Sequence, residues 1–192
     1  MQSYAEPRVH FWNRNEYYKM AEAGLFDGVH VELIEGQVME MSPIGSLHVT
    51  ATGLAGEVLK SAFGPGYFVR EQAPLDAGEL SEPQPDVAII QGDRRQFKNA
   101  HPKMAVLIVE IAETSLAYDR TEKASLYAKI GIPDYWILNL PRRRLEVCRQ
   151  PVRNESSPFG FAYADLKVLA EGDSVSPLLR PDVQISVASL LP

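Results

Sequence analysis

The chain has 192 residues, of which 45% are hydrophobic and 23% are charged. These values are ordinary for a globular protein with one sizeable core, and they exclude a disordered, collagen-like or coiled-coil chain. The formal charge of −6 argues against a general nucleic-acid coat protein, which needs a strong excess of basic residues. Contact with DNA needs only a local basic patch, so a DNA-processing enzyme stays open.

Cysteine use and hydropathy predict a location in the cytoplasm. Cys148 is the only cysteine, so no internal disulfide can form, as suits a reducing compartment. The polar stretch 1–10 lacks the apolar centre of a signal peptide. The longest apolar run, 104–112, is too short to span a bilayer. We therefore expect a soluble, cytoplasmic protein with no membrane partner.

The first part of the chain predicts a helix followed by a β-hairpin. Asn13 or Asn15 is a suitable cap for a helix that Gly24 ends. Two strand-like stretches follow at 29–33 and 37–41, separated by a turn that contains glycine.

Helices and strands then alternate through the rest of the chain. Apolar residues at helical spacing predict a helix from Ser46 to the Gly-Pro-Gly sequence at 64–66. Asp119, with Glu122 as its partner in a capping box, is expected to begin a helix that closes at Gly131. The remaining predicted strands are 67–73, 86–90, 105–112, 135–140, 144–149, 167–169 and 183–187, with a loop at 151–158. This order predicts a mixed α/β (α+β) fold in one domain, with a central sheet flanked by helices.

One acid lies in a segment that has every other mark of a buried strand. The run 105–112 is apolar on both faces except at Glu110, which is typical of a central strand covered on both sides. Alternation directs Glu110 to the same side as Val106 and Ile108. Burying an uncompensated carboxylate is costly, so we expect a cation, a buried lysine or an opening into a cleft beside it.

Asp86 and Lys123 are two further charges at the predicted core. Asp86 begins a strand next to that of Glu110, and a divalent cation is the commonest way to relieve the repulsion between two converging carboxylates. Lys123 shares a helix face with Leu126 and Tyr127. Its ammonium group must therefore leave the core or meet a carboxylate such as Glu110.

Each charge also has a simpler interpretation. Glu110 and Lys123 could form a structural ion pair, and Asp86 could cap a turn. Glu32, which alternation sets opposite its apolar strand neighbours, could be exposed, and His48 could be an ordinary surface or core histidine. These interpretations leave unexplained why the charges gather around one sheet.

In this order and spacing the motifs resemble the PD-(D/E)XK nuclease superfamily, and within it the bacterial "putative restriction endonuclease" family, a former domain of unknown function. The resemblance covers residues 27–150. It is carried by Glu32-Leu33-Ile34-Glu35-Gly36, Met41-Ser42-Pro43, His48, Gln84-Pro85-Asp86-Val87-Ala88, Val109-Glu110-Ile111, Ser115, Tyr118-Asp119-Arg120, Lys123, Leu126-Tyr127-Ala128, Gly131-Ile132-Pro133 and Tyr135-Trp136.

This resemblance implies a restriction-endonuclease-like fold and a metal-dependent endonuclease that hydrolyses phosphodiester bonds of DNA with Mg²⁺ (or Mn²⁺). Asp86, Glu110 and the backbone carbonyl of Ile111 would bind the metal. Lys123 would act on the attacking water and on the transition state, and Glu32 would be an additional acid facing the metal.

The chain departs from the wider superfamily at one position. The superfamily's lysine normally lies two residues after the second acid, where this chain has Ala112. In the resembling branch the following helix supplies the lysine, which matches Lys123. The helix-face argument reaches the same residue independently.

The remaining expectations concern partners and competing functions. By analogy with nucleases that cut both strands we expect a homodimer, and the alternative function is an inactive nuclease fold that binds DNA or a protein. The lack of paired histidine spacing argues against a zinc hydrolase, and the lack of a G-x-S-x-G motif against a serine hydrolase. Basic residues that could contact DNA phosphates, or simply line solvated loops, are Arg94, Arg95, Lys98, Lys103, Arg142, Arg143 and Arg144.

Overall fold

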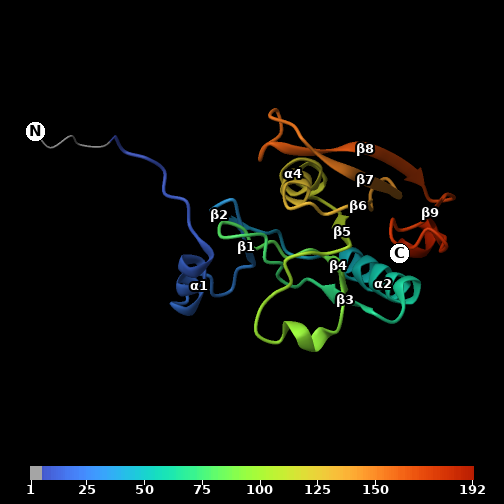
Figure 1. Ribbon diagram of the computed structural model, residues 1–192, viewed down its shortest axis with the longest axis horizontal. Coiled ribbons are helices and arrows are strands. Elements are labelled where there is room, and N and C mark those ends of the chain that lie inside the picture. The colour runs from blue at the N-terminus through green and yellow to red at the C-terminus, as the bar shows by residue number, and fades with distance from the viewer. Residues whose placement is uncertain (1–5) are drawn as a thin grey trace, which may run out of the picture. The chain divides into compact units, whose positions relative to one another are not determined.

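The computed structural model describes residues 6–192, and the chain folds into two compact units (Figure 1). One unit comprises Met1–Pro43 with Asp76–Pro83, and the other comprises Ile44–Leu75 with Gln84–Pro192. The residues before position 6, part of the stretch predicted not to be a signal peptide, lie outside the described residues. The single-domain organisation expected from the sequence stays a prediction.

The first unit contains α1 (Arg14–Glu22) and an antiparallel hairpin of β1 (Val31–Ile34) and β2 (Gln37–Glu40). Asn13 caps α1 in a capping box with Glu16, so the predicted helix is confirmed and Asn13 is its cap. The predicted hairpin is confirmed too. Its two turn residues, Glu35 and Gly36, have φ of 47° and 79°. Glycine at the second position favours such a turn, because it adopts positive φ without steric strain.

The second unit contains a six-stranded mixed sheet in the order β3-β4-β5-β6-β7-β8, which confirms the predicted central sheet. Neighbouring strands are antiparallel except β5 and β6, which are parallel and joined by a helical crossover. The strands are β3 (Tyr67–Glu71), β4 (Val87–Gln91), β5 (Leu107–Ala112), β6 (Asp134–Asn139), β7 (Arg144–Arg153) and β8 (Phe161–Ala170).

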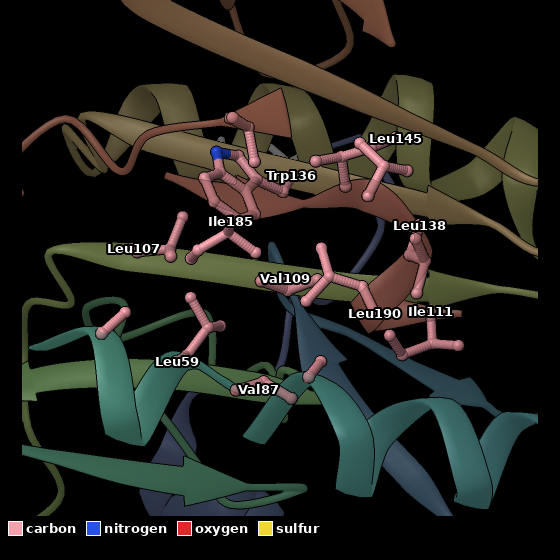
Figure 2. Close-up of a cluster of buried hydrophobic side chains, with 14 of the residues drawn as sticks. Leu59, Val87, Leu107, Val109, Ile111, Trp136, Leu138, Leu145, Ile185 and Leu190 are labelled. Atoms are coloured by element: carbon pink, nitrogen blue, oxygen red, sulfur yellow. The ribbon is translucent and has the colours of Figure 1, made fainter. Parts of the chain in front are cut away.

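Helices cover both faces of this sheet. The long helix α2 (Ser46–Phe63) packs on one face together with the C-terminal segment, and Figure 2 shows Leu59 of α2 and Leu190 of that segment beside Val109 of β5. The crossover helix packs on the other face, where Tyr127 contacts the second core cluster. Its parts are α3 (Leu116–Tyr118), η2 (Asp119–Lys123) and α4 (Ala124–Lys129).

Shorter elements complete the second unit: η1 (Arg94–Phe97), β9 (Ser174–Val175), β10 (Ile185–Ser186) and η3 (Val187–Leu190). Across residues 6–192, no helix has both the length and the apolar character that crossing a membrane requires.

The predicted start of the crossover helix is wrong. The helix begins at Leu116, and the segment from Asp119 to Lys123 is a π-helical turn in which the Ala124 N–H donates to the carbonyl of Asp119. Asp119 is buried inside the helix and accepts a hydrogen bond from Ser115 Oγ at 2.5 Å. It therefore does not form the predicted capping box with Glu122.

The C-terminal strands are longer than predicted. The strand β7 continues through Pro151, which the sequence predicted to lie in a loop. Beyond Arg149 this strand pairs only with β8, so on its other side no neighbouring strand requires the N–H that proline lacks. The strand β8 has ten residues, where the sequence predicted three.

Two orientations also differ from strict alternation. Glu32 was interpreted as exposed on its pattern alone, yet it is buried, as is every residue of β1. Val106 precedes β5 and packs with the α2-side cluster, while Ile108 packs with the opposite cluster. Strict alternation therefore relates Glu110 to Ile108 but not to Val106, because β5 begins only at Leu107.

Candidate active site

Two acids meet where β4 and β5 pair. Val87 is opposite Val109 in the antiparallel register, so continuing the ladder by one residue sets Asp86 opposite Glu110. The Asp86 N–H donates to Glu110 Oε2 at 3.0 Å. The backbone of Asp86 thus contacts the carboxylate of Glu110, in agreement with the convergence expected from the sequence.

The carboxylate of Asp86 is fixed from two sides. Its Oδ2 accepts a hydrogen bond from the Ile111 N–H at 2.8 Å, and its Oδ1 lies 2.7 Å from His48 Nε2. The side chains of Asp86 and His48 are each 14% exposed, so this end of the cluster reaches solvent.

The carboxylate of Glu110 is held by two side chains of the crossover helix. Lys123 Nζ lies 3.3 Å from Glu110 Oε1, and Tyr127 Oη donates to the same oxygen at 2.6 Å. Lys123 and Tyr127 are four residues apart and so share a helix face. The side chains of Lys123 and Glu110 are 2% and 5% exposed, which makes this the closed end of the cluster.

The π-helical turn lies directly before α4 and ends at Lys123. Besides the Ala124 N–H, the carbonyl of Asp119 accepts a hydrogen bond from Tyr135 Oη at 2.9 Å. The turn is thus anchored to β6 of the sheet. Such turns are rare in helices and occur frequently at functional sites.

Sequence reasoning underestimated His48. Burial favours its neutral form, but the hydrogen bond and charge of Asp86, assisted by Glu113 and Asp119, outweigh that effect and raise the pKa of His48 above its ordinary value. Periodicity could not reveal this contact, because 38 residues separate the two partners. The only signal was the place of His48 among the motifs of the resembling family.

The donor set suits a hard divalent cation. Mg²⁺ prefers oxygen ligands and usually keeps several waters, so the carboxylates of Asp86 and Glu110 fit it chemically. No three His, Cys, Asp or Glu side chains form a metal-binding cluster within the described part of the chain. An ion held by this pair would therefore complete its coordination with water or with backbone oxygens such as the Ile111 carbonyl.

Glu32, the third acid predicted for the site, belongs to the first unit. It lies on β1 opposite Met39 and is buried. Its role as an additional acid facing the metal stays a prediction.

Three of the seven basic residues predicted to contact DNA already have partners for their side chains in the protein. Arg143 donates two hydrogen bonds to Glu171, both at 2.7 Å, and Arg94 donates to the carbonyl of Val69 at 3.1 Å. The guanidinium of Arg95 lies 3.7 Å from Asp93. The remaining residues, all exposed and without an ion pair in the chain from residue 6 onward, are Lys98, Lys103, Arg142 and Arg144.

Comparisons with known proteins agree with this architecture. The crystal structure of "a putative nuclease belonging to DUF820" from Anabaena variabilis ATCC 29413 matches with a TM-score of 0.67, 14% identity, and coverage of 92% of this chain and 95% of that chain. At this identity the likeness shows a shared fold. No curated protein matches the chain. The family model described as "Uma2: Putative restriction endonuclease" matches residues 14–188. The resemblance drawn from the motifs is thereby confirmed, and the chain belongs to the Uma2 "putative restriction endonuclease" family.

Proposed function

We propose that the protein is a metal-dependent endonuclease that hydrolyses phosphodiester bonds of DNA. Membership of a restriction endonuclease family supports a nuclease. The observation that carries the finer proposal is the contact of Asp86 with Glu110 at 3.0 Å, with Lys123 3.3 Å from the second acid and the first acid open to solvent. Paired acids and a lysine with access from one side are the groups that metal-assisted hydrolysis requires.

In this proposal Asp86 and Glu110 hold Mg²⁺ (or Mn²⁺), with the Ile111 carbonyl as a further ligand. When bound, the ion supplies an activated water and offsets charge that develops on the phosphate. His48 and the Ile111 N–H keep the Asp86 carboxylate in one orientation.

Lys123 and Tyr127 have the corresponding role at the other acid. Both donate to Glu110 Oε1, so they compensate the buried carboxylate and fix its position. The Lys123 ammonium also orients the attacking water and offsets negative charge in the transition state.

Several finer features belong to the same proposal. Exposed Lys98 and Arg142 contact the phosphate backbone of DNA, and Glu32 supplies an additional acid. The protein acts in the cytoplasm and as a homodimer.

Plasmid cleavage tests the proposal. Purified protein is expected to nick or linearise supercoiled plasmid DNA with Mg²⁺ or Mn²⁺ and to lose this activity in EDTA. Asp86→Asn, Glu110→Ala and Lys123→Ala should each lower the cleavage rate by at least roughly a hundredfold. The matched control Asp182→Asn changes an exposed acid paired with Arg180 and should cleave normally.

One observation favours a second function, an inactive fold that binds DNA or a protein. Every carboxylate oxygen of Asp86 and Glu110 already accepts a hydrogen bond inside the protein, so the pair is stable without an ion. DNA binding by fluorescence anisotropy, with no cleavage under any metal condition, would favour this function over the nuclease.

A further inference from the structure

The strand β8 ends the six-stranded sheet and has an open outer edge (Figure 1). It pairs with β7 at every residue except Ala164, and the backbone of residues 162–169 makes no other hydrogen bond within the described chain. The opposite edge is protected differently, since Arg94 caps the Val69 carbonyl of β3 and α2 packs along that strand. Long open edges are templates for pairing with another strand.

The side chains of β8 suit such pairing. Leu166 and Val168 are 59% and 49% exposed, although they are large apolar residues. Ala164 and Ala170, which lie on the same face of the strand as these two residues, are also exposed. Asp165 and Lys167 flank Leu166, and neither forms an ion pair in the described residues. The edge thus presents apolar side chains together with one charge of each sign.

These residues are self-complementary in a single antiparallel register. When two copies of one strand pair in antiparallel fashion, the backbone groups of every second residue point toward the other copy. These groups meet each other only if the two-fold axis passes through a residue and not between two residues. A two-fold axis at Leu166 sets Asp165 of each copy opposite Lys167 of the other. An axis at Asp165 or Lys167 would instead oppose like charges, which destabilises a sheet.

We propose that two copies of this chain associate through β8, in antiparallel register centred on Leu166, to form a continuous twelve-stranded sheet of two six-stranded halves. The contact is isologous, as a two-fold dimer requires. It joins two identical edges, gives each edge backbone hydrogen bonds, and forms two Asp165–Lys167 pairs. This surface rests on the homodimer proposed above and assigns its interface, and its test does not depend on cleavage.

Charge exchange tests the pairing in solution. Sedimentation velocity should give the mass of two chains for the natural protein. Asp165→Lys opposes lysines at both pairs and should weaken association on the order of tenfold or more. The double exchange Asp165→Lys with Lys167→Asp restores opposite charges and should recover the dimer, which also shows that the strand still folds.

Cysteine cross-linking tests the register itself. Opposite residues in an antiparallel pair have Cα atoms about 4.5–5.5 Å apart, within the range of a disulfide. Leu166→Cys should therefore form a covalent dimer under mild oxidation. Val168→Cys is the matched control. In this register residue 168 faces residue 164 of the other copy, so the two cysteines at position 168 are four residues apart along the strand, about 13 Å. The natural Cys148 lies opposite Leu166 in the β7–β8 register and could form a disulfide within one chain, so both variants are made in a Cys148→Ala background.

Three results would overturn the proposal: a single-chain mass at all concentrations, a dimer that Asp165→Lys does not weaken, or cross-linking of Val168→Cys as fast as that of Leu166→Cys. None of these results bears on plasmid cleavage, so failure of the interface and failure of the nuclease are distinguishable.

Discussion

Tyr127 donates its hydroxyl to Glu110 Oε1 at 2.6 Å, the same oxygen that Lys123 approaches at 3.3 Å. A buried carboxylate thus has a neutral donor and a cation on one oxygen, while its other oxygen binds the Asp86 backbone. Because Lys123 and Tyr127 lie on the crossover helix and Asp86 directly precedes β4, the position of Glu110 is fixed by donors from separate elements. Removing any one donor should cost stability as well as affect chemistry.

Tyr127→Phe isolates the phenol in this arrangement. The change keeps the buried ring and removes only the hydroxyl, so we expect a loss of about 1–3 kcal/mol in the free energy of unfolding, measured by urea denaturation. Tyr67→Phe is the control, since Tyr67 is half-buried and packs its ring on Phe63. Equal stability of the Tyr127→Phe variant and the natural protein would show that the hydroxyl contributes nothing net.

His48→Gln should impair metal use more than folding. Loss of the contact with Asp86 leaves that carboxylate less well oriented, and residues that orient metal ligands typically contribute about 10–100-fold to metal affinity or activity. We expect half-maximal plasmid cleavage at a correspondingly higher Mg²⁺ concentration. His101→Gln, which changes a histidine beside Arg70, is the control. An unchanged Mg²⁺ dependence would remove His48 from the site.

Asp134 should be among the most sensitive positions for stability. It is fully buried and accepts hydrogen bonds from Arg149, Trp136 Nε1 and the Leu178 N–H. Asp134→Ala leaves these donors without an acceptor, and breaking such a buried pair costs roughly 3–5 kcal/mol. Asp182→Ala, at an exposed pair, should leave the free energy of unfolding nearly unchanged. Urea denaturation of both variants compares them directly, and similar losses would contradict this expectation.

Glu146 predicts a dependence of stability on acid. Burial alone would raise its pKa, but the bidentate contact with Arg120 at 2.6 and 2.7 Å and the hydrogen bond from Asn139 outweigh burial, so the pKa of Glu146 is lowered. A lowered folded-state pKa means that the stabilisation is complete above the ordinary value of 4.5 and is lost as the pH falls through the folded value.

The matched variant for this titration is Glu146→Gln. At pH 6 it should be less stable than the natural protein, and the difference should shrink as the pH falls below about 4.5. Urea midpoints measured between pH 6 and pH 3 would show this convergence. A difference that stays constant across the range would assign the effect to packing rather than to charge.

The thiol of Cys148 should be inert in the folded protein. Burial raises the pKa of Cys148 to about 12, so at pH 8 only about one thiol in ten thousand is ionised. We expect no reaction with Ellman's reagent under native conditions and full reaction in denaturing urea. The exposed thiol of a Leu25→Cys variant should react at once and serves as the positive control. Fast native labelling of the natural protein would show that the site opens readily.

The sequence predicted the framework of the site because the signals there are local. Uniform apolar character identified the buried strand around Glu110, and helical spacing placed Lys123 on the inner face of the crossover. The Gly-Pro-Gly end of α2 and the glycine turn of the hairpin were likewise local features, and both are confirmed.

The sequence did not predict features that depend on distant partners. The role of His48 requires a contact across 38 residues, and the burial of Glu32 is contrary to its strand pattern. The π-helical turn was not predicted, because aspartate is a residue type that often caps a helix. In the structure the Asp119 side chain instead accepts a hydrogen bond from Ser115, one turn earlier in the helix. Only tertiary packing decides which of these local options the chain adopts.

Ala112 shows how this family can escape searches for a linear motif. Its methyl group is fully buried among apolar side chains on the side of the sheet that carries the crossover helix, where a lysine of the usual spacing would have to fit. The ammonium group that contacts Glu110 instead belongs to Lys123, which lies on the crossover helix thirteen residues after Glu110. Distant relatives with the lysine on the crossover helix are therefore recognised by comparing the positions of side chains in space and not the spacing of residues in the sequence.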